Sequence, residues 1–277
     1  AYTGNLLDTI DTGEGNLVTP SGLSQLNAWV DSDLDNTALQ FYGADLSGNL
    51  WRVDIDDRVP PAGKEALRLA RLVRDGKPQP VTTRVELSEI RSGNTRIPVV
   101  TVGTGRQLGV SDLSDGSIQS LYTIKDPLDG RVFDDVRAAN LLVKRQIVAG
   151  ERSVKGDAID WNTKAGWYLD FDQTDSLGER VSIDPEQQLG VIRVVTNVPD
   201  STVCRPIAQS RLYNLEYQTG LYVPSAPRTV AGKRVLSQTL AAGARTIKVG
   251  ESTFSLVTSD NGSVSIVSNP SIGNSVP

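Results

Sequence analysis

Apolar and polar residues alternate along most of this chain in short segments. Glycine, asparagine, aspartate, serine and threonine separate the segments, and these residues favour turns. Within residues 49–55 the even-numbered side chains face one side and the odd-numbered ones the other, as a strand of period two requires. The pattern predicts many short antiparallel strands. They are expected within residues 38–45, 48–56, 96–105, 117–126, 166–172, 190–198, 210–220, 245–250 and 262–269.

Internal similarity indicates how these strands are grouped. The stretches GNLLDTID and GNLWRVDID begin at Gly4 and Gly48, a separation of 44 residues, and each places a Gly-Asn turn before an apolar strand. DNGSVSIVS near the C-terminus is a third turn-then-strand unit. A repeat of this length is typical of one propeller blade. We therefore expect an all-β fold, a modified β-propeller or its last several blades, with a β-sandwich as the alternative.

Two segments have a helical rather than an alternating pattern. Residues 62–80 place Leu67, Ala70 and Val73 at helical spacing among strong helix formers, which predicts a short surface helix before Pro78. Residues 134–150 are mixed in character. These are the short helical insertions expected in the β fold. No linker long enough to separate two domains interrupts the pattern, so residues 1–277 are expected to form a single domain.

Composition excludes several classes of protein. The formal net charge is −5 and basic residues are scattered among acidic ones, which argues against a nucleic-acid groove. No apolar run is long enough for a membrane helix, and the first residues are expected to be mature folded chain rather than a targeting segment. Histidine is absent, which excludes His-based triads and His-ligated zinc or haem. The single cysteine, Cys204, cannot form an internal disulfide.

The acidic stretch that begins at Asp31 is the main candidate for a metal site. Asp31, Asp33 and Asp35 occupy positions 1, 3 and 5 of a loop, and the carbonyl of Thr37 occupies position 7, as in a calcium-binding EF-hand loop. Without histidine, a bound metal must be a hard cation held by oxygen, such as Ca²⁺. Position 9 is Leu39 rather than an acidic residue. The sequence leaves two interpretations open, a calcium loop and a solvated acidic hairpin loop.

Asn36 occupies position 6 of the same loop, where an EF-hand has glycine. Asparagine tolerates the left-handed conformation better than most residues, so this position is compatible with the loop.

Other candidates have simpler interpretations. Residues 111–115 offer two aspartates and two serines for a second cation, but their composition is that of an ordinary turn. Residues 102–109 lack the lysine and third glycine of phosphate-binding loops, which indicates a strand-end turn. Trp51, Trp161 and Trp167 would suit a binding platform, although packing in the core is the usual role of such residues.

Several motifs together resemble a known family. They are LQFYGADLSGNLWRVDI, GKPQPVTTRVEL, VVTVGTGRQLG, IQSLYTIKDP, DWNTKAGWYLDF, GERVSIDPEQ, VTNVPDSTVC and LYNLEYQTG, in this order over nearly the whole chain. The chain is similar to the C-terminal domain of the type IV pilus biogenesis and tip-adhesin family (PilY/PilC type). The resemblance implies a non-enzymatic, modified β-propeller at the tip of a type IV pilus, forming the C-terminal part of a longer protein.

The resemblance also implies partners and a location. These are minor pilins at the pilus tip and a host or abiotic surface receptor, after export through the periplasm and outer membrane to the cell surface. The expected roles are pilus assembly, the balance of extension and retraction, adhesion and twitching motility. The family's calcium loop carries over to Asp31, Asp33, Asp35 and Thr37 but not to Leu39, where the family has Asp, so Ca²⁺ would bind weakly or not at all.

Two enzyme classes built on related propellers are alternatives. A quinoprotein dehydrogenase would share the repeats, but that family uses a vicinal cysteine pair and this chain has one cysteine. A sialidase-like hydrolase would require Ser-x-Asp-x-Gly-x-Thr-Trp repeats, and ADLSGNLW has the wrong spacing. The sequence therefore favours a binding and assembly protein.

Overall fold

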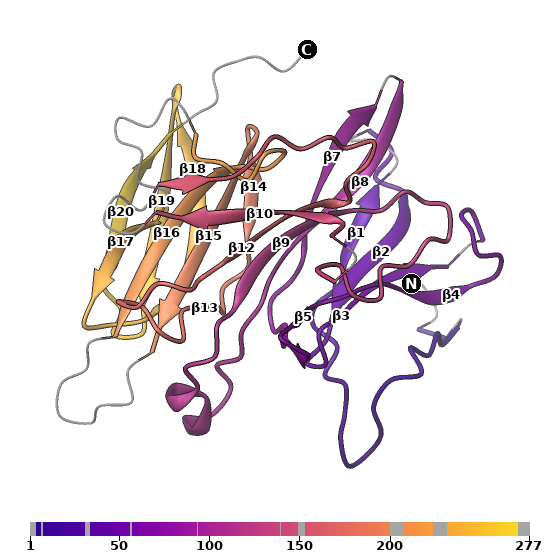
Figure 1. The fold of residues 1–277 in the computed structure, drawn as a ribbon, viewed down its shortest axis with the longest axis horizontal. Coiled ribbons are helices and arrows are strands. Elements are labelled where there is room, and N and C mark those ends of the chain that lie inside the picture. Colours follow the sequence, from indigo (N-terminus) through magenta and orange to yellow (C-terminus); the bar gives the residue numbers. More distant parts are fainter. Residues whose placement is uncertain are drawn as a thin grey trace.

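A computed structural model describes residues 4–6, 8–30, 34–55, 57–92, 94–138, 140–148, 153–199, 208–223 and 232–270. Within these residues the regular structure is β-strand except for one short 3-10 helix, η1 (Val110–Ser114). The all-β prediction is confirmed, whereas the predicted helical insertions are not found there. No helix in the described part of the chain is long and apolar enough to cross a membrane. Figure 1 shows strands grouped into separate sheets.

Sheet I is an antiparallel meander in which each strand pairs with the next. Its strands are β1 (Asn27–Val30), β2 (Ala38–Ala44), β3 (Asn49–Asp54) and β4 (Glu65–Arg71). The two-stranded ribbon β5 (Val73–Arg74) and β6 (Lys77–Pro78) follows.

The prediction of a helix over residues 62–80 is wrong, because strands β4, β5 and β6 occupy this segment. Leu69 and Ala70 are both fully buried, and β4 pairs along the whole of β3. A helix here would leave the backbone of β3 without a partner along that edge, and this loss outweighs local helix propensity.

Sheet II has six strands in the order β11-β10-β12-β9-β8-β7. They are β7 (Glu86–Ser92), β8 (Thr95–Gly103), β9 (Ser120–Lys125), β10 (Leu142–Ile147), β11 (Val154–Lys155) and β12 (Gly166–Asp170). The pair β10–β12 is parallel and the other pairs are antiparallel. The segment of mixed character, 134–150, contributes β10 and part of the long connection that precedes it.

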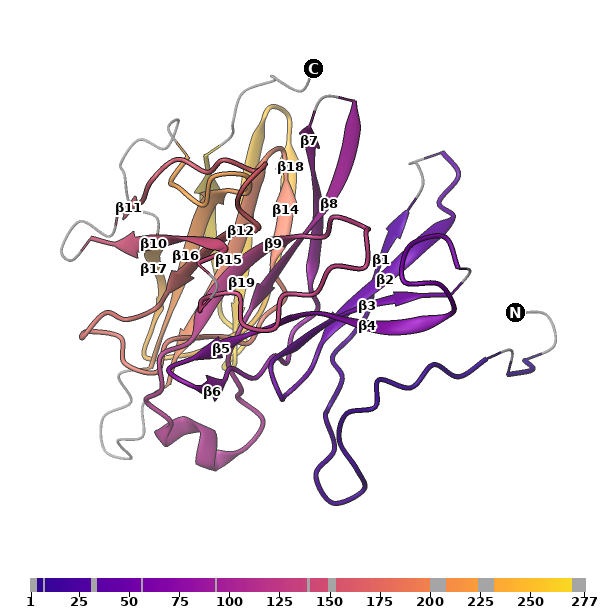
Figure 2. The same cartoon turned by 45° about the vertical axis from the view of Figure 1, so that its right-hand side comes forward.

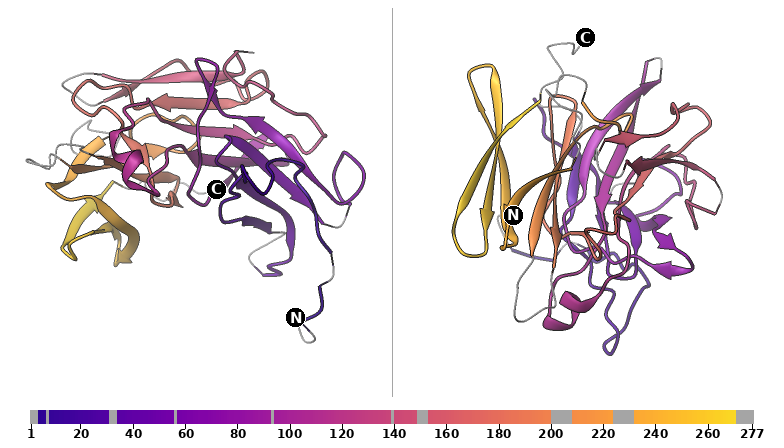
Figure 3. Two further views of the ribbon diagram at one scale, coloured as in Figure 1. Left: turned by 90° about the horizontal axis from the view of Figure 1, so that it is seen from below. Right: turned by 60° about the vertical axis from the view of Figure 1, so that its left-hand side comes forward.

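Sheets III and IV complete the described chain. Sheet III comprises β13 (Arg180–Val181), β14 (Glu186–Gln188), β15 (Val191–Val198), β16 (Gln209–Glu216) and β17 (Gly232–Ser237). Sheet IV is the meander β18 (Ala241–Val249), β19 (Ser252–Ser259) and β20 (Val264–Asn269). Figure 3 shows sheet IV at one side of the molecule with sheet III next to it, and Figure 2 shows the same sheets from a further direction.

Each sheet buries apolar side chains against the next one along the chain. One core cluster joins sheets I and II, a second joins sheets II and III, and a third joins sheets III and IV. All eight residues of β15 are buried, because sheet III is covered on both faces. This explains why even the polar residues of β15, Arg193, Thr196 and Asn197, are buried, whereas a half-exposed strand alternates between buried and exposed positions.

The predicted propeller is not confirmed, because the described sheets do not close into a ring. The proposed repeat also differs between its copies. GNLWRVDID contains β3, but the described residues of the first copy, between Gly4 and Asp11, contain no strand. A Gly-Asn turn alone does not make a strand where no neighbouring strand is available for pairing.

The β2–β3 hairpin shows how a local sequence signal becomes structure. The fully buried Asp45 accepts hydrogen bonds of 2.9 Å from the backbone N–H groups of Ser47 and Asn49. It accepts two more, also 2.9 Å, from the amide of Asn49 and the indole of Trp51. Gly48 has φ +75°, and an added Cβ there would lie 2.7 Å from the carbonyl oxygen of Leu72. The turn thus fixes the register of both strands.

A buried ion pair connects sheets I and II. Arg52 on β3 donates to Asp126, just after β9, at 3.1 Å, and the hydroxyl of Tyr42 donates to the same carboxylate at 2.9 Å. Burial raises the pKa of Tyr42, and the charge of Asp126 raises it further, so the hydroxyl stays a donor. Arg52 thus faces a second packed surface rather than solvent.

Candidate functional site

The acidic stretch predicted to bind calcium lies in the connection between β1 and β2. Asp31 and Asp33 lie outside the described residues. Asp35 and Thr37 are exposed in the turn, and the Thr37 hydroxyl donates to the Asp35 carboxylate at 2.6 Å. Asn36 adopts the left-handed conformation expected at this position, with φ 53°. Within the described part of the chain no three acidic or cysteine side chains converge on one point, so the calcium prediction stays a prediction.

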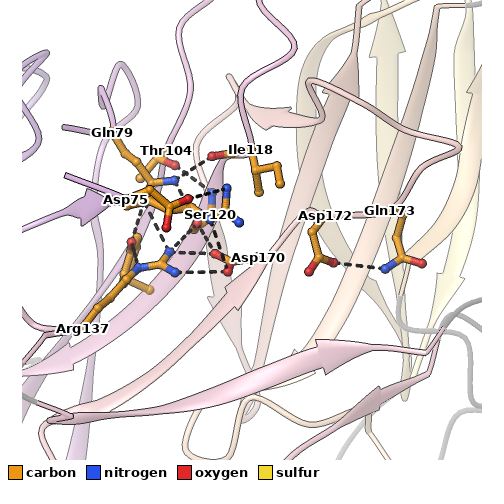
Figure 4. Close-up of polar contacts among 11 residues, drawn as sticks. Asp75, Gln79, Thr104, Ile118, Ser120, Arg137, Asp170, Asp172 and Gln173 are labelled. Carbon is orange, nitrogen blue, oxygen red and sulfur yellow. Dashed lines mark hydrogen bonds and ion pairs between the residues drawn. The ribbon is translucent and has the colours of Figure 1, made fainter. Parts of the chain in front are cut away.

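A buried polar cluster lies where the β5–β6 ribbon packs against sheet II (Figure 4). At its centre is Arg137, from the long connection between β9 and β10. Its guanidinium donates to Asp170, at the end of β12, at 2.7 and 3.1 Å, and to Ser120, on β9, at 2.8 Å. Asp170 and Ser120 are register partners on neighbouring strands, and the Ser120 hydroxyl donates to Asp170 at 2.6 Å. The pairing of β9 with β12 therefore places the acceptors Ser120 and Asp170 side by side, and the β9–β10 connection supplies the guanidinium of Arg137.

Two tyrosines enclose the guanidinium of Arg137. Its central carbon lies 4.1 Å from the ring centroid of Tyr168 and 5.1 Å from that of Tyr122, distances typical of cation–π contacts. Burial alone would raise the pKa of Asp170, but the hydrogen bond and the charge of Arg137 outweigh it and hold that pKa below its ordinary value. Asp170 is therefore a buried, ionised carboxylate whose oxygens are hydrogen-bonded to Arg137. Such a group is not suited to act as a general base.

The same cluster fixes the starting points of two loops. The backbone N–H of Ser120 donates to the Thr104 hydroxyl at 2.8 Å, and the side-chain amide of Gln79 donates to the Ile118 carbonyl at 2.9 Å. These contacts hold both ends of the connection between β8 and β9. Asp170 directly precedes the connection between β12 and β13. The cluster is thus a scaffold for the loops beyond it (Figure 4).

Arg180, on β13, binds backbone carbonyl groups of both connections. Its guanidinium donates to the carbonyls of Arg106 at 2.8 Å, Asp112 at 2.7 Å and Gly178 at 2.8 Å, and also to that of Asp115. The side chain is almost fully buried. One cation therefore ties residues of the β8–β9 connection to the β12–β13 connection, and carbonyl acceptors of an otherwise irregular backbone are satisfied.

Residues 111–115, the alternative cation site, form η1 and its end. The buried carboxylate of Asp112 accepts from the backbone N–H groups of Leu108 and Gly109 at 2.8 and 3.0 Å and from Arg106 at 2.8 Å. Burial alone would raise the pKa of Asp112, but these hydrogen bonds outweigh it and the pKa lies below its ordinary value. The turn interpretation is confirmed. Gly103 ends β8, which confirms the strand-end turn in residues 102–109.

The tryptophans do not form a binding platform. Trp51 and Trp167 are buried in different sheets, and Trp161 packs partly buried against the second core cluster. The indole N–H of Trp167 donates to the carbonyl of Tyr217 at 2.9 Å. Their packing role is confirmed.

Carboxylates join the edges of sheets II, III and IV. Glu86 on β7 accepts from the backbone N–H of Gln187 on β14 at 2.9 Å, and Glu186 on β14 accepts from that of Thr246 on β18 at 2.7 Å. A groove of about 430 Å³ opens beside them, between residues 182–184 and the start of β18. These acids protect backbone donors at strand edges, a structural role.

Sequence reasoning did not find the clusters around Arg137 and Arg180. Arg137 and Asp170 are 33 residues apart, and Arg137 and Gln79 are 58 residues apart. Neither pair forms a local pattern, because the packing of a long connection against distant segments brings the residues together. The signal in the sequence that could have indicated these clusters is the presence of polar residues, such as Ser120 and Asp170, in otherwise apolar strands.

Comparisons with known proteins agree with this fold. The structure matches the crystal structure of the Pseudomonas aeruginosa PilY1 C-terminal domain with a TM-score of 0.67 and 20% sequence identity. The match covers 92% of this chain and 62% of that one. The chain therefore has the fold of a PilY1-type C-terminal domain.

In sequence, the chain is 26% identical over 250 residues to a type IV pilus biogenesis factor PilY1 homolog from Xylella fastidiosa. The alignment covers 79% of this chain and 16% of that protein, so the chain corresponds to a small part of the relative's length. No family model matches the chain. The resemblance to a PilY1-type C-terminal domain is confirmed in both sequence and fold.

Proposed function

We propose that this chain acts in type IV pilus biogenesis as a non-enzymatic binding module. The agreement of two independent comparisons supports the proposal. One matches most of the chain in sequence to a pilus biogenesis factor, and the other matches nearly all of it in fold to the C-terminal domain of such a factor. In this proposal the four sheets are part of a modified β-propeller formed with the rest of a longer protein.

The chemistry of the described residues supports a binding role. The ionisable side chains at the meeting points of the sheets are tied to arginines, hydroxyls or backbone groups, as at Asp170, Asp112 and Glu186. Histidine is absent from the sequence. A protein built this way contributes rigid surfaces, and recognition rather than bond-making is the activity that it supports best.

The proposed location is the cell surface, at the tip of the pilus, after export through the periplasm and outer membrane. The proposed partners are minor pilins and a host or abiotic surface receptor. Through them the protein would act in pilus assembly, in the extension–retraction balance, in adhesion and in twitching motility.

Calcium binding at the β1–β2 connection is part of the proposal. The left-handed Asn36 and the hydrogen-bonded pair of Asp35 and Thr37 fit a tight loop whose oxygens suit a hard cation. Asp31 and Asp33 would supply the other carboxylates. Titration calorimetry of the chain beside Asp33→Ala tests this: heat that is lost in the variant supports the site, whereas equal heats from both proteins would refute it.

The test of the pilus function uses the intact protein in its own cell. The gene segment that encodes this chain is deleted, and surface pili are counted by electron microscopy together with twitching zones. We expect both to fall sharply and to be restored by the complete gene. Gold labelling of the chain should lie at pilus ends. Unchanged pili and motility in the deletion strain would refute the proposal.

A further inference from the structure

The free edge of strand β18 borders the groove of about 430 Å³ between this strand and residues 182–184. In sheet IV, β18 pairs with β19 on one side only. The backbone N–H of Thr246 donates to Glu186 on β14 at 2.7 Å, so the backbone groups of this residue point away from β19. Because the residues of a strand direct these groups to alternate edges, those of Ala244 and Lys248 point the same way. β18 therefore presents backbone donors and acceptors along this edge.

A short stretch of the β18 edge is open between two covered positions. The N–H of Thr246 is covered by a carboxylate, and the N–H of Ala241 donates to two side chains of sheet III at 2.8 and 3.0 Å. Between them, Ala242, Gly243 and Ala244 line the groove with no side chain larger than a methyl group. Edge strands are usually protected by charges, proline or bulges, and of these devices the stretch has the bulge at Ala242. An incoming chain can therefore reach the backbone here.

The opposite wall of the groove is also backbone. It is formed by residues 182–184, which connect β13 to β14. Within the described part of the chain, their N–H and C=O groups form no hydrogen bond with another backbone group. The buried Ile183 and the half-buried Leu256 add apolar surface to the lining. An occupant that bonds to both walls needs two free edges, which a single extended segment has and the edge strand of a folded sheet does not.

The charge of the groove favours a basic residue in the occupant. Arg245 lines the groove, but its guanidinium donates to Glu186 at 2.9 Å, so the two charges neutralise each other. Asp184 also lines the groove, and its carboxylate accepts from the backbone N–H of Arg84 at 2.9 Å, a donor that carries no charge. The Asp184 wall is therefore negative and attracts lysine or arginine.

We propose that the groove between β18 and residues 182–184 binds an extended segment of a partner protein by strand addition. The segment pairs with β18 around Ala244, directs an apolar side chain toward Ile183 and places a lysine or arginine beside Asp184. Main-chain hydrogen bonds supply affinity in this mode of binding, and the alternate side chains supply specificity. The site is independent of the proposed pilus function, so either can fail without the other.

The probe is a phage-displayed library of random heptapeptides, selected on the immobilised chain. Enriched peptides are synthesised, and their Kd is measured by fluorescence anisotropy. We expect alternating apolar residues with a lysine or arginine, and a Kd that Ala244→Pro weakens about tenfold or more. Proline removes the outward N–H of this residue and leaves the bonds to β19 in place. The matched control, Lys248→Pro, removes an N–H on the same edge outside the groove and should change the Kd less than about twofold.

Two further measurements test the same site without a change to β18. Asp184→Asn should weaken the binding of the basic peptides at low salt and reduce its dependence on salt. N-methylation of the central peptide residue removes a main-chain donor and should weaken the Kd about tenfold. These measurements decide the outcome if circular dichroism shows that Ala244→Pro is unfolded.

Four outcomes would overturn the inference. Peptides that bind Ala244→Pro, folded, as tightly as the wild type would place the binding site elsewhere, and a selection that enriches no peptide would remove it. A dimer of the chain in sedimentation that Ala244→Pro dissociates would make the edge a contact between two copies. Peptide binding seen only after residues 271–277 are removed would make the C-terminal segment of this chain the occupant. Each of these results leaves the pilus function to be decided by the deletion strain.

Discussion

Replacing Arg137 by leucine should destabilise the protein strongly. The arginine is mostly buried, makes three hydrogen bonds to Asp170 and Ser120 of 2.7 to 3.1 Å, and lies against two tyrosine rings. Leucine keeps part of the packing but leaves the buried carboxylate of Asp170 without its main counter-ion. Removing one partner of a buried ion pair costs about 3–5 kcal/mol. The lower part of this range is expected, because Ser120 still donates to Asp170 and Arg74 lies 3.7 Å away.

The pH dependence follows from the lowered pKa of Asp170. A carboxyl group with a depressed pKa in the folded state stabilises the protein above its ordinary pKa, which is 3.8 for this group. That stabilisation is lost as the pH falls through the folded-state value. The difference in unfolding free energy between the wild type and Arg137→Leu should therefore be largest near neutral pH and narrow as the pH falls below 3.8.

The measurement is urea unfolding followed by tryptophan fluorescence at neutral and acidic pH. Arg131→Leu is the control, because Arg131 forms an exposed ion pair with Asp129. This variant should lose no more than about 1 kcal/mol of unfolding free energy. The double variant Arg137→Leu with Asp170→Leu should recover part of the loss, since no unpaired charge stays buried. A neutral-pH loss for Arg137→Leu as small as that of the control would refute the reasoning.

Three further predictions can be checked by the same unfolding measurements. Asp45→Ala leaves buried donors of the β2–β3 turn unsatisfied and should cost about 3 kcal/mol. Gly220→Ala places a Cβ about 2.5 Å from the Trp167 ring at φ +67°, so it should cost more than Gly76→Ala, which has φ +75° but open space; equal costs would contradict this. Burial raises the pKa of Glu86. The unfolding free energy of the wild type should therefore fall relative to that of Glu86→Gln as the pH rises through the raised pKa. A difference in unfolding free energy that does not change with pH would refute this prediction.

The strands were predictable wherever alternation and turn residues agreed. β2, β3, β9, β12, β15 and β20 fall within segments expected to be strands, and β8 and β16 each begin one residue before theirs. The left-handed Asn36 and the Gly48–Asn49 turn before β3 were also predictable, because these residue types favour such conformations. β4 was not predictable, because its residues favour a helix and only their pairing with β3 makes this segment a strand.

The candidate site was much less accessible to sequence reasoning. The acidic stretch from Asp31 was found because its residues are neighbours in the chain. The Arg137 cluster and the clamp of Arg180 join residues from distant strands and loops, and no local spacing marks them.

The sequence by itself determined that this chain forms an all-β protein with short strands and no histidine chemistry, because alternation, turn preference and composition are local or additive properties. The tertiary structure alone decided that four sheets stack in chain order, that sheet III is covered on both faces, and that buried arginines hold two loops in place. Those outcomes depend on which surfaces meet and which buried polar groups find partners. Such choices are settled only when distant segments pack together.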